Sequence, residues 1–503
     1  MAETRAAPAS PPRWVFAVVV AAGLAVRLWQ YAGNPSFWID ELALVDDVLH
    51  MPLRALLTGP LPLDQIAPPG FLAALKASAV WLGTDERALR AFPFACSLAA
   101  VLLFAAVARR ALRPWTALLA AAIFSLLPLL ISWTASVKQY STDVAASLVV
   151  VLAALRLLER RLRPRDVALA AAAGVVAPWL SHPAAFVVAG CGAAVVGVRL
   201  RDRDRSAFGA VVAAVLAWAV SAGGAVQLAR SILSDGTRDY MARFWAPALP
   251  DAGTLALVAL GAVLLACRGA RIAVVLLAPV ALTLAAAGLH AYPFSGRAVL
   301  FLVPIFVLAA AEALALLVGG AARLGAPRPI AAAVLVAALL AAFATNLPVY
   351  QREEVRPVLR RLAQRLEPGD ALYVIYGAKR AFSFYAPRAG IPASRATLGG
   401  CHRGDRRGYL RELDAFRGSP RVWVLIAHPA ARLAEAPVIR GYLERIGTRR
   451  ETIAETGASA ELFDLSDPGR LSSAAAETVP IPAVAANDAY GCANGPIGRA
   501  PWE

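Results

Sequence analysis

The chain is poor in charged residues and has almost no lysine. Aspartate, glutamate, lysine and arginine make up 17% of its 503 residues, whereas a soluble domain carries about a quarter. Only Lys76, Lys138 and Lys379 are lysines among 50 basic residues. Because arginine serves almost everywhere else, each lysine either marks a site that needs a compact ammonium or survives by chance.

Motifs for metals, nucleotides and internal repeats are also missing. Cys96, Cys191 and Cys267 lie in apolar segments and read as packing residues, while Cys401 and Cys492 could pair outside the membrane. The sequence has no CxxC spacing, no GxGxxG and no Walker loop. These absences argue against a zinc site and a nucleotide cofactor. The lack of a clear internal repeat also argues against an inverted-repeat transporter.

Long apolar runs dominate what is present. Hydrophobic residues make up 59% of the chain and the mean hydropathy is +0.60, with runs near the roughly 20 residues that cross a bilayer. We therefore predict a polytopic α-helical membrane protein. The eleven expected spans are 14–32, 89–109, 114–135, 141–158, 167–181, 183–199, 207–228, 253–267, 271–290, 297–318 and 329–348.

The net charge of +16 does not indicate nucleic acid, because the basic residues cluster in short connections such as ARRALRP and LERRLRPRD. The first span has no convincing cleavage site, so we expect an uncleaved helix with a cytoplasmic N-terminus. Segment 70–83 is apolar but short. If this segment does not cross the membrane, the basic loops lie on the same side as the basic N-terminus, as the positive-inside trend requires. We therefore expect an interfacial helix there. This predicts a multi-pass protein of the bacterial inner membrane whose C-terminal domain is periplasmic.

The composition changes after Pro348. Residues 351–366 have a helical amphipathic pattern, ALYVIY and RVWVLIAH are strand-like, and ETIAETGASAELFDL suggests a closing hairpin. We predict a transmembrane domain over 1–349 and a small periplasmic α/β domain over 350–466. The remainder, 467–503, is expected to be a disordered tail.

The first outer connection is acidic. Asp40 and Glu41 follow Phe37 and Trp38, with Asp46 and Asp47 next. A carboxylate desolvated beside aromatic rings suits a general base or a divalent-cation ligand. The alternative is that these are solvated loop acids.

Polar residues also occur in three further outer connections. VKQYSTD carries Lys138, Tyr140 and Asp143, and Lys138 would either bind a phosphate or snorkel at the interface. Arg297 begins a span at its outer end, where neither the helix dipole nor the positive-inside trend favours it, so a phosphate or carboxylate partner is expected. The weaker candidates, which are more easily structural, are His182, His290 and Tyr292.

In their order these motifs resemble the GT-C membrane glycosyltransferases of the PMT/ArnT-like branch, which includes rhizobial lipopolysaccharide galacturonosyltransferases. The matching pieces, within roughly 14–310, are W-x-D-E at Trp38 to Glu41, QIAPPGFLAALK at Gln65 to Lys76, ALRAFPFACSL, VKQYSTD and SGRAVLFLVP. Ala67 stands where PMT members carry the histidine of H-P-P, and Lys138 lies near a position where ArnT-like relatives commonly carry arginine. The sugar is therefore left open.

The resemblance implies a GT-C-like fold and inverting transfer of a sugar from a polyprenyl-phosphate carrier. The acceptor would be a hydroxyl on a membrane lipid, a cell-envelope glycan or a protein at the outer face. The candidate catalytic residues are Asp40, Glu41 and Asp143. The donor phosphate is assigned to Lys138, Arg297 and Tyr140, and other substrate contacts to Gln65, Lys76, His182, His290 and Tyr292. A divalent cation, Mg or Mn, would be held by Asp40 and Asp143.

Three other functions remain open from the sequence. One is a transporter or flippase for a lipid-linked glycan, although the polar residues lie at span ends rather than at the midplane. The others are an O-antigen ligase or polymerase and a non-catalytic protein with the same fold.

Overall fold

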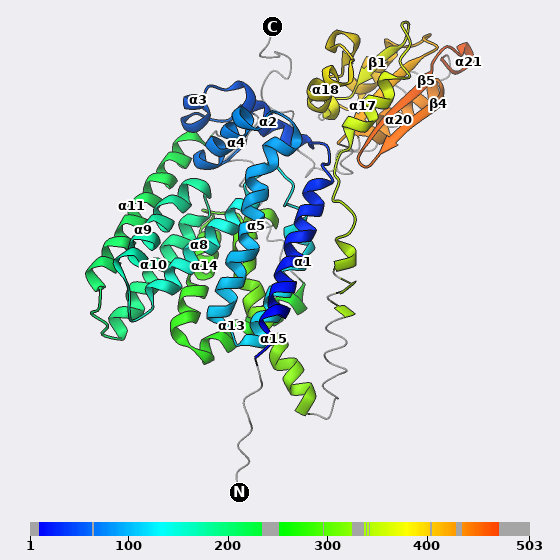
Figure 1. Cartoon of the computed structure of the whole chain (residues 1–503). Coiled ribbons are helices and arrows are strands. Elements are labelled where there is room, and N and C mark those ends of the chain that lie inside the picture. The colour runs from blue at the N-terminus through cyan, green and yellow to red at the C-terminus, as the bar shows by residue number, and fades with distance from the viewer. Residues whose placement is uncertain are drawn as a thin grey trace. The chain divides into compact units, whose positions relative to one another are not determined.

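The computed structural model describes residues 10–62, 65–233, 251–294, 296–323, 337–338, 340–341, 343–402, 405–428 and 435–471. The chain divides into two compact units, and each is described here by itself (Figure 1). Unit 1 contains Met1–Asn34, Met51–Leu61 and Ile66–Tyr350, and unit 2 contains Pro35–His50, Pro62–Gln65 and Gln351–Glu503. The predicted disordered tail lies outside the described residues from 472 onward.

Unit 1 is helical. Within its described residues, seven helical stretches are long and apolar enough to cross a membrane: α1 (Arg13–Ala32), α5 (Glu86–Ala111), α8 (Tyr140–Leu157), α10 (Ala184–Arg201), α11 (Phe208–Ile232), α14 (Ala270–Gly288), and η2 (Gly296–Leu302) with α15 (Val303–Arg323). The shorter helices are α3 (Leu53–Thr58), α4 (Pro69–Trp81), α6 (Pro114–Leu126), α7 (Pro128–Ile131), α9 (Pro164–Leu180) and α13 (Ala252–Arg268). Helix α4 covers the segment predicted as an interfacial helix.

Two details of the span prediction change. The predicted span 114–135 is two short helices, because the chain leaves the α conformation at Leu127, directly before Pro128. A proline disfavours the helical conformation in the residue before it and cannot donate a backbone hydrogen bond. Half of the predicted span 329–348 lies outside the described residues, so the count of eleven stays a prediction.

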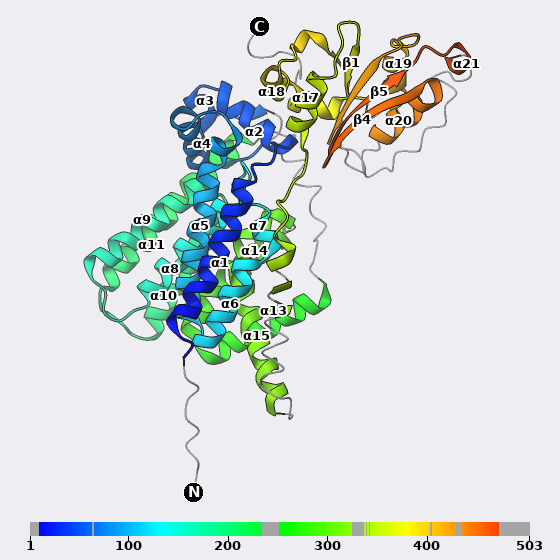
Figure 2. The same cartoon turned by 45° about the vertical axis from the view of Figure 1, so that its right-hand side comes forward.

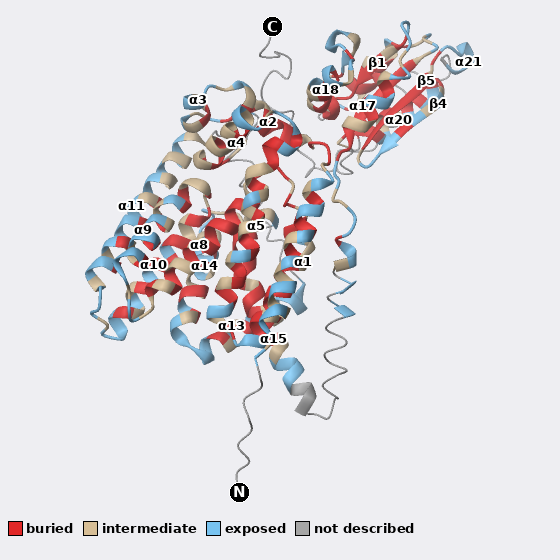
Figure 3. Cartoon of the chain, in the orientation of Figure 1, coloured by how far each residue is buried: buried red, intermediate tan, exposed pale blue. Residues whose placement is uncertain are grey.

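Helix α8 lies inside unit 1 (Figures 2 and 3). It packs against α5, α9, α10 and η2. Of its most apolar stretch of residues, 83% is buried, compared with 22% for the corresponding stretch of α1. From Val144 to Leu155 its sequence is apolar or small on every side, which is typical of a helix surrounded by others. The first turn of α8 therefore holds its polar side chains inside the protein.

Unit 2 is built on one mixed sheet of five strands in the order β2-β1-β3-β5-β4. The parallel strands are β1 (Ala371–Val374), β2 (Thr397–Leu398) and β3 (Val422–Ala427). Strands β4 (Thr448–Glu455) and β5 (Ala458–Asp464) form the antiparallel hairpin that the sequence predicted. The helices are α17 (Val355–Ala363), α18 (Lys379–Tyr385), α19 (Arg407–Asp414), α20 (Glu435–Ile446) and α21 (Pro468–Leu471), with the short turn η3 (Tyr376–Ala378) after β1.

Helix α2 (Ile39–His50) belongs to unit 2, where it packs on α18, although the chain reaches it directly after α1. Glu354 accepts hydrogen bonds from the backbone N–H of Ser36 at 3.0 Å and from its hydroxyl at 3.0 Å. Glu353 accepts from the backbone N–H of Ile39 at 3.1 Å, and the Tyr385 hydroxyl lies 2.7 Å from the backbone nitrogen of Phe37. The start of α2 is therefore fixed by residues more than three hundred positions away.

Replacing Glu354 with alanine should loosen this attachment. The change leaves two buried donors of Ser36 without their acceptor, which costs about 1–3 kcal/mol. We expect faster limited proteolysis within Pro35–His50 and a lower unfolding midpoint. Glu444→Ala is the matched control, because Glu444 is half exposed in its pair with Arg449 and should change little. An equal effect of both variants would contradict a role of Glu354 in holding the start of α2.

Candidate functional site

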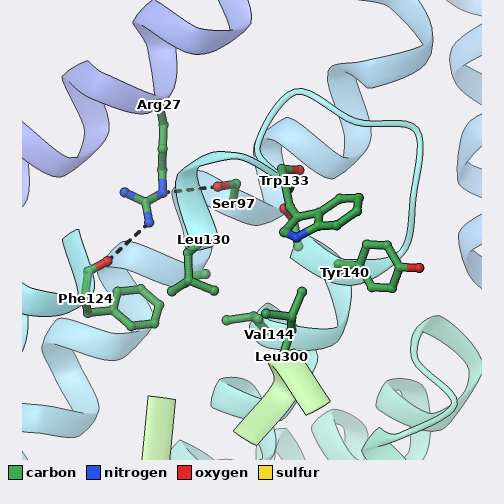
Figure 4. A pocket seen from close by; sticks show the side chains of 10 residues that line it. Arg27, Ser97, Phe124, Leu130, Trp133, Tyr140, Val144 and Leu300 are labelled. Carbon is green, nitrogen blue, oxygen red and sulfur yellow. Dashed lines mark hydrogen bonds between the residues drawn. The ribbon is translucent and has the colours of Figure 1, made fainter. Parts of the chain in front are cut away.

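The connection that leads into α8 is held by a buried arginine. Arg27 of α1 is 1% exposed and donates to the carbonyls of Ser125 at 2.8 Å and Gly23 at 3.1 Å. It also donates to the Ser97 hydroxyl at 3.2 Å, which lies 3.0 Å from the hydroxyl of Thr134 (Figure 4). The carbonyl of Ser125 has lost its helical partner because α6 ends at Leu126, so the guanidinium satisfies it.

A pocket lies beside this arginine. Figure 4 shows its lining, in which Arg27 and Ser97 lie at one side and Trp133 and Tyr140 at another. The Trp133 ring meets the Tyr140 ring edge-on at 4.6 Å between centroids, and the Ser141 hydroxyl donates to the Trp133 carbonyl at 3.1 Å. The bend before α8 is therefore a fixed structure rather than a loose loop.

The predicted phosphate-binding residues gather around Tyr140. The Arg297 guanidinium lies 5.8 Å from the centre of the Tyr140 ring, within the range of a cation–π contact. Lys138 precedes Tyr140 by two residues and is only 6% exposed. Arg297 lies at the start of η2, which packs on α8. Two cations from distant parts of the sequence thus flank the start of one buried helix.

Asp143 lies one turn into α8 and is 5% exposed. Its side chain hydrogen-bonds with Ser181, at the end of α9. Among the described residues, its second oxygen, Oδ1, is a buried atom without a hydrogen-bond partner. An acceptor left open in this way is expensive inside a protein unless a ligand or water meets it.

His182, next to Ser181, also has an open acceptor. One ring nitrogen hydrogen-bonds the backbone of Ala67, and the buried Nε2 has no partner among the described residues. Burial lowers the pKa of His182 to about 4, against the weaker effect of the Ala67 contact. The imidazole is therefore neutral at physiological pH.

The other predicted residues of unit 1 contribute unequally. Tyr292 donates to the carbonyl of Ala298 at 2.8 Å and lies within electrostatic range of Asp143 and Tyr140. It therefore belongs to the same cluster of polar residues at the start of α8. His290 is exposed. Lys76 donates to the Met51 carbonyl at 3.1 Å and thereby ties α4 to the start of the α3 segment. The sequence missed Gln139, which donates to the Ile66 carbonyl at 3.2 Å.

The predicted acids of the first connection lie in unit 2. Asp40 is half-buried, and Glu41 is 1% exposed and accepts from the Trp38 backbone N–H at 3.3 Å. They begin a helix rather than lying in a loop. Gln65 is half-buried in the separate segment Pro62–Gln65.

The sequence also missed the cation that these acids face. Burial lowers the pKa of Arg380 in α18, and nearby Tyr376, Asp46, Asp47 and Asp40 oppose that shift. Asp40 lies in unit 2 and Asp143 lies in unit 1, so the catalytic roles expected for them remain predictions. Among the described residues, no group of three or more His, Cys, Asp or Glu side chains is placed to hold a metal. The divalent cation stays a prediction too.

The neutral state of His182 has a consequence for stability. Between pH 6.5 and about 4 the unfolded chain binds a proton at this position and the folded chain does not. Stability from this residue is therefore present above pH 6.5 and is lost as the pH falls towards 4, by up to about 3 kcal/mol. We expect the thermal unfolding midpoint of His182→Gln, relative to the wild type, to rise on acidification across this window. A constant difference would contradict a neutral imidazole.

Comparison with known proteins identifies the fold. No family model and no curated protein matches the sequence. Among solved structures, the chain is similar to ArnT from Cupriavidus metallidurans, both bound to undecaprenyl phosphate and in the apo state. In each case the identity is 14%, the TM-score is 0.50, and the match covers 90% of this chain and 98% of that chain. An Archaeoglobus fulgidus oligosaccharyltransferase matches with 12% identity and a TM-score of 0.48, over 89% of this chain and 72% of its own. The chain therefore has the GT-C fold of the membrane glycosyltransferase ArnT.

Proposed function

We propose that this protein transfers a sugar from a polyprenyl-phosphate carrier to an acceptor hydroxyl at the outer face of the bacterial inner membrane. The acceptor would be a membrane lipid, a cell-envelope glycan or a protein. The observation that carries the proposal is the group at the start of α8, where Lys138 and Arg297 flank Tyr140 and the open acceptor of Asp143 lies one turn further. The ArnT structure with the same fold contains undecaprenyl phosphate.

The cations suit a phosphate leaving group. When the bond between the anomeric carbon and the phosphate oxygen breaks, the phosphate takes the electron pair and gains negative charge. The buried Lys138 and the half-buried Arg297 would stabilise that charge, and such interactions are strongest where water is excluded. Lysine acts as a point charge and arginine as a planar donor, so the two together hold a lipid phosphate at one position.

The acceptor oxygen would attack the anomeric carbon from the face opposite the phosphate, which inverts the configuration in one displacement. The proton of the acceptor hydroxyl would pass to a carboxylate acting as general base. We assign this role to Asp40, on the half-buried first turn of α2. Glu41 caps the turn that carries Asp40, through the Trp38 N–H, and so acts as a positioning residue.

Asp40→Asn tests the base. The amide keeps the size of the side chain but cannot take the proton, so transfer should fall by about 10²–10⁴-fold. The assay uses membranes and a panel of radiolabelled undecaprenyl-phosphate sugars, from which the one that the wild type transfers is chosen. Asp46→Asn is the control, because Asp46 lies on the same helix in a partly exposed pair with His50. Undiminished transfer by Asp40→Asn would remove Asp40 from the mechanism.

Lys138→Met and Arg297→Gln test the phosphate site. Loss of one charged partner costs about 1.5–3 kcal/mol, so undecaprenyl phosphate should bind about 10–100-fold more weakly to either variant. Binding is measured on purified protein in detergent, with Arg54→Gln as a control at an exposed arginine of α3. Unchanged binding in both variants would contradict the assignment. Binding by the wild type without transfer of any sugar would favour a transporter instead.

A further inference from the structure

The carboxyl ends of the three parallel strands of unit 2 form a topological switch point. Strand β1 lies between β2 and β3; the chain leaves β1 towards β2 and leaves β3 in the opposite direction, towards β4. In open α/β sheets, ligands bind outside the carboxyl ends of the strands at such a point. None of the roles proposed above uses this edge.

Three connections bring polar side chains to this edge. The chain after β1 passes through η3 to Lys379, the chain after β2 passes through Gly400 to His402, and β3 is followed directly by His428. His428 has a positive φ of 54° and contacts Glu353 with its Nδ1 at 2.7 Å. The backbone at the end of β3 is thus held in a conformation that a non-glycine residue rarely adopts.

One carboxylate of this edge is fully engaged. Glu412 of α19 contacts His402 Nε2 at 2.8 Å, accepts from the Tyr373 hydroxyl at 2.7 Å and accepts from the Gly400 N–H at 2.8 Å. Burial opposes ionisation of Glu412, but these hydrogen bonds outweigh it and lower the pKa. Glu412 is therefore an anion whose hydrogen-bond donors are already in place, and it fixes the end of β2 against α19.

Lys379 is the exception at this edge. The residue as a whole is 8% exposed, and among the described residues its ammonium makes no hydrogen bond or ion pair, although the nitrogen itself is not fully enclosed. The ammonium nitrogen lies 5.6 Å from the centre of the Tyr376 ring and within electrostatic range of Glu412. Arg380, the next residue, lies in the field of three acids of α2. An ammonium that is largely surrounded by protein, lacks an ion pair and can still be reached from solvent is placed to pair with an anionic ligand.

We propose that this edge is a binding site for a carboxylate-bearing ligand, whose carboxylate pairs with the Lys379 ammonium beside the Tyr376 ring. A single negative charge fits because two acids, the half-buried Glu412 and the buried Glu435, lie at the same edge and would repel a phosphate dianion more strongly. The compact ammonium also explains why lysine is kept here in a chain that otherwise uses arginine. The site uses residues of unit 2 alone, none of which is assigned to the donor, and its proposal does not depend on glycosyl transfer.

The scarcity of lysine makes a direct test possible. Full-length protein labelled with ¹³C at lysine Cε gives three signals, one each for Lys76, Lys138 and Lys379, assigned by single Lys→Arg variants. Sodium acetate, D-glucuronate, D-glucose and inorganic phosphate are added separately at constant ionic strength. We expect saturable shifts of the Lys379 signal with acetate and glucuronate only. No shift, equal shifts with glucose, or a preference for phosphate would overturn the proposal.

Lys379→Met provides the second arm. If the ammonium is kept for a ligand, this variant should unfold at a higher temperature than the wild type while glucuronate affinity falls at least about tenfold. Arg388→Met is the matched control, because it removes one positive charge from an exposed side chain of the same unit and should keep the affinity. A lower unfolding temperature together with unchanged affinity would assign Lys379 a purely structural role. Neither arm uses the lipid-linked donor, so failure here leaves the proposed transfer standing.

Discussion

The buried guanidinium of Arg27 is the constraint on which the α8 site depends. A cation among apolar helices is destabilising by itself, and so are the open carbonyls at the end of α6. Arg27 joins the two and extends through Ser97 to Thr134. The proline break after Leu127 is therefore tolerated, and the chain can turn sharply before Tyr140. The end of α6, the bend before α8 and the buried arginine therefore stabilise one another.

The two units carry their charges in different ways. In unit 1 the polar residues of the site are few, deeply buried and partly unsatisfied, as at Asp143 and His182. In unit 2 the acids of α2 face Arg380, and Glu353 and Glu354 fix the chain before that helix. Buried polar groups without a hydrogen-bond partner are costly, so they are expected where a ligand supplies the partner. Hydrogen-bonded clusters instead hold elements in place. Unit 2 departs from this pattern at Lys379, whose ammonium makes no ion pair among the described residues.

The sequence predicted what depends on local pattern. Apolar runs located the helices of unit 1, and ALYVIY, RVWVLIAH and the final hairpin located four of the five strands. It could not predict pairings between distant residues. Arg27 looked like one polar residue in an apolar run, and Glu353 and Glu354 like ordinary acids of an amphipathic helix. Only folding brings Arg297 to Tyr140, or Arg380 to the acids of α2, because the partners are far apart in the sequence.

The attachment of α2 to unit 2 sets a waiting time during synthesis. Ser36 and its acceptor Glu354 are 318 residues apart, so at 5–20 residues per second the ribosome needs about 15–60 s to supply the second partner. During that interval α2, whose side chains are mostly buried in the finished protein, has no surface of its own unit to cover it. A fragment that begins at Gln351 would likewise lack one of its core helices. Unit 2 of this protein is therefore not a domain that can be cut from the chain at one place.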